Sequence, residues 1–280
     1  MPASPTVEPV RRILGAVRDV GEVTSRLRGH RFSELRWVDS TGSTNADLIA
    51  RAREGDGECV LVADHQEAGR GRLDRSWQAP AGASLLMSVL VRPPFPAQGP
   101  QLLSTAVALA AVRSLERLSG LTAGLKWPND LVVAGAAADG SDLKLGGLLS
   151  ELHLGAGGDA VVVGIGVNVA WADRGFPPEL ASTATSVDLQ GARVARQDLV
   201  VEMLVELDSL DGLARADACE QLMVEHREHC VTLGRRVRVE LPGAELSGTA
   251  VDLAADGSLE VRDDAGSLHT VSVGDVVHLR

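Results

Sequence analysis

The apolar positions of this chain follow two spacings, one typical of strands and one typical of helices. Alternating or continuous apolar runs predict strands at 35–40, 58–66, 83–93, 131–135, 144–154 and 160–170, and a further strand leads into a Pro-Asn turn at 124–130. Apolar residues at helical spacing predict helices at 8–29, 43–53, 100–119, 197–213 and 214–231. Ser43 is expected to cap the second helix, because its hydroxyl can accept a hydrogen bond from a free amide. The mixture of elements predicts the α+β class.

The last part of the chain has a different pattern. Short alternating runs follow Gly234 and are separated by Pro-Gly, Asp-Gly and Ala-Gly turns. Such spacing predicts a small antiparallel β-barrel of about 45 residues. We therefore expect three parts, which are an N-terminal helical extension at 1–30, a main domain at 31–232 and the barrel at 233–280.

Length and composition limit the class of protein. With 280 residues, of which 45% are hydrophobic, the chain can form one large core and a small second domain. No apolar run reaches the roughly 18 residues of a spanning helix, and Met1 to Pro9 do not resemble a secretory signal. We therefore expect a cytoplasmic protein without a membrane partner.

Charge and cysteine content bear on two further kinds of partner. The net charge is −11, whereas a nucleic-acid-binding protein usually presents a basic face. The N-terminal arginines are interpreted as a solvated helix face, so no nucleic-acid partner is expected. The three cysteines form no CxxC pair, which predicts reduced, buried thiols. His226, His229 and Cys230 are too few ligands for a metal site.

The distribution of lysine is unusual. Lys and Arg together number 27, but only Lys126 and Lys144 are lysines, which leaves 25 (27 − 2) arginines. A lysine presents a compact charge on a thin stem, whereas an arginine presents a wide planar group. Two lysines so close together indicate a site that needs narrow cations, with chance clustering as the alternative.

A loop rich in arginine and glycine follows the second predicted strand. The segment GRGRLDRSW, residues 69–77, contains Arg70, Arg72 and Arg75 beside glycines that let backbone approach a ligand. Arginines in such a loop suit a polyphosphate. A solvated loop, or a loop that binds a protein partner, is the alternative.

The two lysines lie in two further motifs. In KWPND, residues 126–130, a strand delivers Lys126 to a rigid turn that ends in Asp130. The lysine can neutralise a phosphate oxygen and the carboxylate can bind Mg²⁺, although a simple strand-closing turn would also explain the motif. In KLGGLL, residues 144–149, Lys144 precedes two glycines, and glycine within a strand often marks the close approach of a ligand.

Two more motifs offer polar groups at strand ends. GIGVN, residues 164–168, is a buried strand with two glycines and a terminal amide. It is not followed by the rest of a GxGxxG motif and a helix, which argues against a Rossmann dinucleotide site. STGSTN, residues 40–45, places hydroxyls and an amide at a strand-to-helix turn, where they can bind a small polar group or cap the helix.

The order of these motifs resembles that of one known family. STN, Gln66, GRGRxxRxW, KWPND, KLxG and GxGxN follow one another as in biotin protein ligases, from about residue 38 to about residue 170. The predicted barrel is similar to the C-terminal SH3-like domain of that family, so the resemblance covers most of the chain. It implies an α+β fold in which helices flank a mixed central β-sheet, as in the class II synthetase-like ligases.

The resemblance also implies roles for individual residues. One group would bind biotin: Ser43, Thr44, Asn45, Gln66, Arg70, Gly71, Arg72, Lys144 and Gly147. A second group would bind ATP and the adenylate: Arg72, Arg75, Trp77, Lys126, Asn129, Asp130 and Asn168. Arg72, Lys126 and Lys144 would be the catalytic cations. Asp130 would hold Mg²⁺.

The implied reaction has two steps. Biotin and ATP would form biotinyl-AMP and pyrophosphate, and the biotin would then pass to a lysine of a biotin carboxyl carrier protein. Cations would hold the two anions in line, and a loop that orders on binding would keep water from the adenylate. A strand edge of the central sheet could also pair two chains into a homodimer.

The chain departs from the family pattern at two places. Asp74 stands where the family often has glycine or a basic residue, which would stiffen the loop and repel phosphate. About forty residues precede Ser43, too few for the winged-helix domain of some family members. We therefore expect a ligase that does not act as a transcriptional repressor.

Three other functions are weighed against this one. A lipoate–protein ligase would have a glycine-rich segment and a nearby histidine after its arginines, in place of GRGR and KWPND. A non-catalytic scaffold would not need both lysines and all three loop arginines. A biotin-sensing transcription regulator would bind DNA, which a binding assay at stated salt would test.

Overall fold

The computed structural model describes residues 19–73, 75–96, 98–215, 219–241 and 243–279. The predicted helix at 8–29 lies partly outside these residues, and its described part forms α1 (Val20–Arg26). Asp74 lies outside them as well, so its expected effect on the loop stays a prediction.

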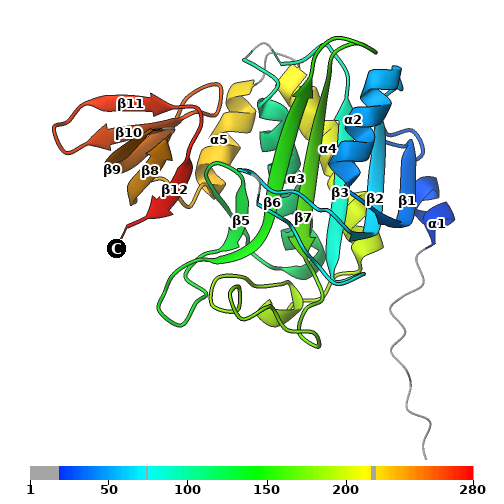
Figure 1. Ribbon diagram of the computed structural model, residues 1–280, viewed down its shortest axis with the longest axis horizontal. Helices are drawn as coiled ribbons and strands as arrows, with labels where there is room; N and C mark the ends of the chain where they lie inside the picture. Colours follow the sequence, from blue (N-terminus) through cyan, green and yellow to red (C-terminus); the bar gives the residue numbers. More distant parts are fainter. Residues whose placement is uncertain (1–18, 74, 97, 216–218, 242, 280) are drawn as a thin grey trace, which may run out of the picture.

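A seven-stranded mixed sheet forms the centre of the protein (Figure 1). Its strands are β1 (Leu35–Thr41), β2 (Cys59–Gln66), β3 (Ser84–Val91), β4 (Gly124–Lys126), β5 (Asp130–Val133), β6 (Leu143–His153) and β7 (Ala160–Asn168). They lie in the order β1-β2-β3-β7-β6-β5-β4. Strands β1 and β2 are parallel, and every other neighbouring pair is antiparallel. The predicted mixed sheet is confirmed.

Helices cover both faces of this sheet. On one face, α2 (Thr44–Glu54) packs Leu48 and Ala52 against Cys59 and Leu61. On the other face lie α3 (Leu102–Ser119) and α4 (Arg196–Arg215), with α5 (Cys219–His229) beside them near β4. Successive residues of a strand face opposite sides of the sheet, and here both sides of the central strands are covered. Strands β3 and β7 are therefore buried along their whole length, which explains their continuous apolar sequences.

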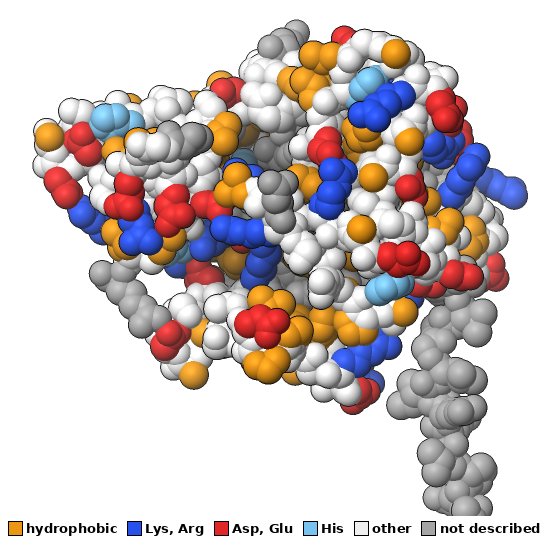
Figure 2. Space-filling model, viewed as in Figure 1, with side chains coloured by type: hydrophobic (Ala, Val, Ile, Leu, Met, Phe, Trp, Pro, Cys, Tyr) orange, Lys and Arg blue, Asp and Glu red, His pale blue; other side chains and the backbone are white. Residues whose placement is uncertain are grey.

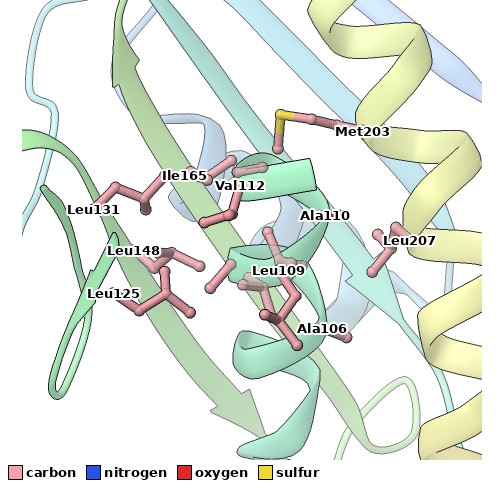
Figure 3. Close-up of a cluster of buried hydrophobic side chains, with 14 of the residues drawn as sticks. Ala106, Leu109, Ala110, Val112, Leu125, Leu131, Leu148, Ile165, Met203 and Leu207 are labelled. Carbon is pink, nitrogen blue, oxygen red and sulfur yellow. The ribbon is translucent and has the colours of Figure 1, made fainter. Parts of the chain in front are cut away.

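The larger core lies between the sheet and α3 and α4 (Figure 3). Leu109 of α3, Leu207 of α4, and Leu148 and Ile165 of the sheet all belong to this cluster of buried side chains. Burying one such side chain contributes about 1.5–3 kcal/mol to folding. None of the helices within the described residues is long and apolar enough to cross a membrane.

Local sequence fixes where α2 begins and ends. Ser43 is the N-cap, as predicted, and its Oγ accepts a hydrogen bond from the amide of Ala46 at 3.5 Å. Gly55 ends the helix with a φ of 86°, a conformation that glycine adopts without strain. The cap places the STN residues at the end of β1, beside the carboxyl end of β2.

A five-stranded antiparallel sheet forms the C-terminal part. Its strands are β8 (Arg236–Leu241), β9 (Ala244–Leu253), β10 (Leu259–Asp263), β11 (Leu268–Val271) and β12 (Asp275–His278), in the order β11-β10-β9-β8-β12. This sheet lies beside the end of the main sheet that carries β5 (Figure 1). The predicted antiparallel strands after Gly234 are confirmed.

The KWPND turn connects the two sheets. The amide of Trp127 donates to Thr232 Oγ1 at 3.0 Å, and its indole Nε1 donates to the carbonyl of Gly257 at 3.1 Å. Arg235 donates to Asp142 Oδ2 at 2.8 Å, and Asp142 Oδ2 also lies 3.3 Å from His278 Nδ1. The C-terminal sheet is therefore tied to the turn and to the β5–β6 hairpin by polar contacts.

His226 of α5 is buried against the core, with 8% of its surface exposed. Burial, together with the positive charges of Arg227 and His229, lowers the pKa of His226 from 6.5 to about 4. The neutral imidazole is therefore the folded form at neutral pH. Its contribution to stability is complete above pH 6.5 and is lost as the pH falls toward 4.

We predict that replacing His226 weakens the acid sensitivity of folding. Between pH 7.5 and pH 5 the wild type should lose about 2 kcal/mol more unfolding free energy than His226→Asn, because only the wild type must bury a titrating imidazole. Urea unfolding at both pH values measures the difference. Equal losses in the two proteins would contradict the burial of a neutral histidine.

Candidate active site

A cavity of about 750 Å³ opens between the main sheet, the 69–77 loop and the C-terminal sheet. All fifteen residues singled out from the sequence line it: Ser43, Thr44, Asn45, Gln66, Arg70, Gly71, Arg72, Arg75, Trp77, Lys126, Asn129, Asp130, Lys144, Gly147 and Asn168. They come from five strands, one helix start and two loops, so the fold gathers segments that are far apart in sequence.

Two glycines of GIGVN form part of the cavity floor. A Cβ atom on Gly164 would overlap the Asn45 amide, and one on Gly166 would lie 2.6 Å from Trp77 Cε2. The motif therefore makes room for two side chains from other elements. This function differs from the phosphate-binding role of glycines in a dinucleotide fingerprint.

Polar groups are fixed at the end of the cavity near α2. The amide and hydroxyl of Thr44 donate to Gln66 Oε1 at 2.8 and 3.0 Å. Asn45 Nδ2 donates to the carbonyl of Leu149 at 3.0 Å and to Glu151 Oε2 at 2.9 Å. The hydroxyl of Ser88 donates to Asn45 Oδ1 at 2.6 Å. A polar ligand would meet side chains whose orientation is already set.

The sequence pattern did not identify Ser88 and Glu151 as residues of the site. Ser88 lies within an apolar strand, and Glu151 lies at a position that looks like the solvent face of β6. Neither position carries a local signal, because their partners are 43 and 106 residues away along the chain.

The arginines of the 69–77 loop are held by β6, by the KWPND turn and by the C-terminal sheet. Arg70 Nη2 donates to Glu151 Oε2 at 2.9 Å, and Arg75 Nη2 donates to Asp275 Oδ2 at 2.7 Å. Arg72 donates to Asn129 Oδ1 at 3.1 Å and to the carbonyl of Gly274 at 3.2 Å. The loop therefore lies folded onto the cavity, and two of its arginines contact the C-terminal sheet. Asp275 is a third residue that the sequence did not reveal.

The two lysines are in different electrostatic states. Lys144 Nζ lies 2.6 Å from Asp130 Oδ1 and 5.8 Å from the centroid of the Trp77 ring. A Cβ on Gly147 would lie 3.4 Å from the same ammonium group. Among the described residues, no carboxylate lies within ion-pair distance of Lys126. Lys126 therefore offers an uncompensated charge to an anion, whereas Lys144 would have to exchange partners.

Aromatic side chains cover another part of the cavity. Trp171 and Phe176 stack with ring centroids 4.2 Å apart and planes 12° from parallel. The segment 171–196, predicted as a loop, holds both and contains one short 3₁₀ helix, η1 (Asp188–Gln190). The chain has only 4 Trp, 3 Phe and no Tyr, and Trp77, Trp127, Trp171 and Phe176 all line this cavity. That scarcity was a signal that could have identified them.

Asn168 is already engaged within the protein. Only 4% of its surface is exposed, its Oδ1 accepts from Ser84 Oγ at 3.1 Å, and its Nδ2 donates to the carbonyl of Thr185 at 3.1 Å. The residue thus ties the end of β7 to the segment that follows residue 171. Its contact with a ligand would be made by the edge of the amide.

Positive charge gathers in this region of an acidic protein. Three arginines and two lysines line the cavity, and Figure 2 shows Lys and Arg side chains in the hollow between the C-terminal sheet and the rest of the molecule. An apolar floor, fixed polar groups and converging cations suit an elongated ligand with one apolar and one strongly anionic part.

Comparisons with known proteins agree with the motif resemblance. Residues 37–168 match the model of the Biotin/lipoate A/B protein ligase family, and residues 232–279 match the Biotin protein ligase C terminal domain. The biotin--[acetyl-CoA-carboxylase] ligase of Mycobacterium tuberculosis is 41% identical over 261 residues, which cover 90% of this chain and 91% of the relative. The bifunctional ligase/repressor BirA of Bacillus spizizenii is 30% identical, with 82% and 68% covered.

The fold of a solved structure supports the same family assignment as the sequence comparisons. The biotin protein ligase from Aquifex aeolicus, in complex with biotin and ATP, superposes with a TM-score of 0.73 at 26% identity. The match covers 89% of this chain and 100% of the other. Sequence and fold agree over both sheets, and the chain therefore belongs to the biotin protein ligase family of enzymes.

Proposed function

We propose that this protein converts biotin and ATP to biotinyl-AMP and pyrophosphate, and then transfers the biotin to a lysine of a biotin carboxyl carrier protein. The observation that carries the proposal is the convergence of Arg72, Lys126 and Lys144 on one cavity that also has an apolar floor. The names of the relatives support the choice of ligands, since the Aquifex aeolicus enzyme was solved with biotin and ATP.

The biotin end is assigned to the polar groups near α2. Ser43, Thr44, Asn45 and Gln66 offer hydroxyls and amides to the ureido ring, and the hydrogen bonds of Thr44 and Asn45 keep them oriented. Arg70 and Gly71 belong to the loop that would close over biotin. Gly147 leaves space beside Lys144 for the carboxylate end of the ligand.

The first step is an attack by a biotin carboxylate oxygen on the α-phosphorus of ATP. The bond to the β-phosphate oxygen breaks, and its electron pair leaves with pyrophosphate. Arg72 and Lys126 stabilise the charge that builds on the phosphate oxygens, and Lys144 holds the carboxylate in line. Arg75, Trp77, Asn129 and Asn168 complete the nucleotide end.

The second step forms the amide. The neutral amine of the carrier lysine attacks the carbonyl carbon of the mixed anhydride, AMP leaves with the electron pair of the broken C–O bond, and the amine proton passes to solvent. No covalent enzyme intermediate is needed. The folded 69–77 loop limits the access of water, which would otherwise hydrolyse the adenylate.

A magnesium ion is assigned to the nucleotide. Within the described residues, no group of three or more His, Cys, Asp or Glu side chains could hold a metal ion. Mg²⁺ commonly needs only one or two carboxylates in addition to phosphate oxygens. Asp130 is the carboxylate at this end of the cavity, and it would hold the ion in exchange for its present contact with Lys144, 2.6 Å from its Oδ1. The ion would offset charge on ATP.

The remaining assignments concern organisation. We assign catalysis to the domain at 31–232 and treat 1–30 as an N-terminal extension. The domain at 233–280 would support the 69–77 loop. We place the enzyme in the cytoplasm. Strand β1 is one edge of the main sheet and could pair two chains into a homodimer. The absence of repressor activity stays a prediction.

The decisive experiment is pyrophosphate exchange into ATP by purified protein. We expect exchange that requires biotin, because pyrophosphate enters ATP only when biotinyl-AMP forms and then reacts back. The exchange should stop when EDTA removes Mg²⁺. Exchange that depends on lipoate instead would assign the protein to lipoate ligation. If neither biotin nor lipoate supports exchange, the protein would be a binding protein without ligase activity.

Removing either phosphate-binding cation should slow adenylation. Arg72→Ala and Lys126→Ala are each expected to reduce the rate of biotinyl-AMP formation at least about tenfold, roughly 1.4 kcal/mol of transition-state stabilisation. Arg72→Ala should also release the adenylate faster, because its contacts with Asn129 and Gly274 hold the loop. Single-turnover rates and adenylate retention on a filter measure both effects.

Arg262→Ala is the matched control, since Arg262 lies on β10 and does not line the cavity. It should retain the wild-type rate. A wild-type rate in Lys126→Ala would argue against its phosphate role, and unchanged adenylate retention in Arg72→Ala would argue against the lid.

The floor glycines give a separate prediction. A methyl group on Gly166 would lie 2.6 Å from Trp77 Cε2 and would displace the ring, so Gly166→Ala should weaken the binding of a non-hydrolysable biotinyl-AMP analogue at least about tenfold. Gly57→Ala is the control, because no heavy atom lies within 4 Å of its Cβ position. Calorimetry measures the dissociation constant of the analogue for Gly166→Ala and Gly57→Ala. Equal dissociation constants for the two variants would refute the packing role of Gly166.

A further inference from the structure

The backbone on both sides of Lys126 is held by the segment that leads into the C-terminal sheet. The carbonyl of Leu125 accepts a hydrogen bond from the amide of Val231 at 2.9 Å. The amide of Trp127, which follows the lysine directly, donates to Thr232 Oγ1 at 3.0 Å. In the second contact a side chain takes the place of the backbone acceptor that a paired strand would offer. The path of the chain at Lys126 therefore depends on the hydroxyl of Thr232.

His278 of β12 contacts the same hydroxyl. Its Nε2 lies 3.1 Å from Thr232 Oγ1, and its Nδ1 lies 3.0 Å from Arg235 Nη1. Because an arginine side chain can only donate, Nδ1 is the acceptor, and a neutral imidazole then carries its proton on Nε2. His278 Nε2 therefore donates to Thr232 Oγ1, which also accepts from the amide of Trp127.

An ion pair fixes the orientation of this imidazole. Arg235 donates to both carboxylate oxygens of Asp142, at 2.8 and 3.3 Å. Asp142 Oδ1 also accepts from the amide of Gly135 at 3.1 Å, and only 6% of the Asp142 side chain is exposed. The guanidinium that faces His278 Nδ1 is thus anchored to the β5–β6 hairpin of the main sheet.

The charge state of His278 agrees with this arrangement. Burial lowers the pKa of His278 from 6.5 to about 4, and the positive charges of Lys126 and Arg235 act in the same direction, against the opposing charge of Asp142. The imidazole is therefore neutral at pH 7. Thr232 is fully buried and 13% of the His278 side chain is exposed, so water has little access to replace their contact.

We infer that His278 is a positioning residue for Lys126, and that it acts through the Thr232 hydroxyl on the amide that follows the lysine. The inference rests on the proposed function, in which the Lys126 ammonium stabilises phosphate oxygens during adenylation. Among the described residues, no carboxylate within ion-pair distance directs that ammonium, so the backbone sets where its charge lies. A displacement of about 1 Å in a catalytic group can slow a reaction by up to about 100-fold.

The test is the single-turnover rate of biotinyl-AMP formation by the full chain at saturating biotin, ATP and Mg²⁺. Thr232→Val keeps the side-chain shape but removes the acceptor, so it should slow the reaction at least about fivefold. Thr232→Ser keeps the hydroxyl and should stay within about twofold of the wild type. The dissociation constant for biotin should not change, because the biotin end is assigned to groups near α2.

A second pair of variants examines the imidazole itself. His278→Leu removes the donor to Thr232 and should also slow adenylation at least about fivefold, whereas His278→Gln can offer an amide N–H in its place and should restore most of the rate. Thermal unfolding shows whether each variant is folded, and the His278 pair carries the test if Thr232→Val is not. His269→Leu is the matched control, because His269 lies on β11 of the same sheet, contacts Asp263 and does not line the cavity.

A double-mutant cycle separates positioning from a general loss of structure. In a Lys126→Ala background, Thr232→Val should slow adenylation less than about twofold further, because the group that it positions is already absent. An equal slowing in both backgrounds, or wild-type rates in folded Thr232→Val and His278→Leu, would overturn the positioning role. If the wild type itself forms no biotinyl-AMP, the proposed ligase reaction is overturned instead.

Discussion

Repulsion between cations is the constraint on which this structure depends most. Three arginines and two lysines line one cavity, where their like charges repel one another. Without ligand, the protein offsets that repulsion with carboxylates from three elements, which are Glu151 on β6, Asp130 at the start of β5 and Asp275 on β12. A substrate that brings phosphate oxygens would take over part of this compensation.

This arrangement couples the C-terminal sheet to the chemistry. Asp275 and the carbonyl of Gly274 hold Arg75 and Arg72, while Thr232 and Gly257 hold Trp127 of the KWPND turn. Both cation-bearing segments therefore contact the same domain, in addition to the main sheet. The C-terminal sheet therefore helps to position both the loop and the turn.

The two faces of the main sheet divide structural and functional tasks. Strands β3 and β7 are buried along their whole length, which makes the sheet a rigid support. The same strand β7 carries Gly164 and Gly166, where missing side chains admit Asn45 and Trp77. A site built on buried strands can hold its polar groups in fixed orientations, at the expense of fold stability that side chains at the two glycines would provide.

The sequence by itself determined the strands, the main helices, the Ser43 cap and the cation motifs, because apolar periodicity and short-range capping are local properties. It also placed fifteen residues that meet in one cavity. Only the tertiary structure decided that Ser88, Glu151 and Asp275 orient the site. Their partners are distant in sequence, so no local pattern distinguishes them from ordinary core or surface residues.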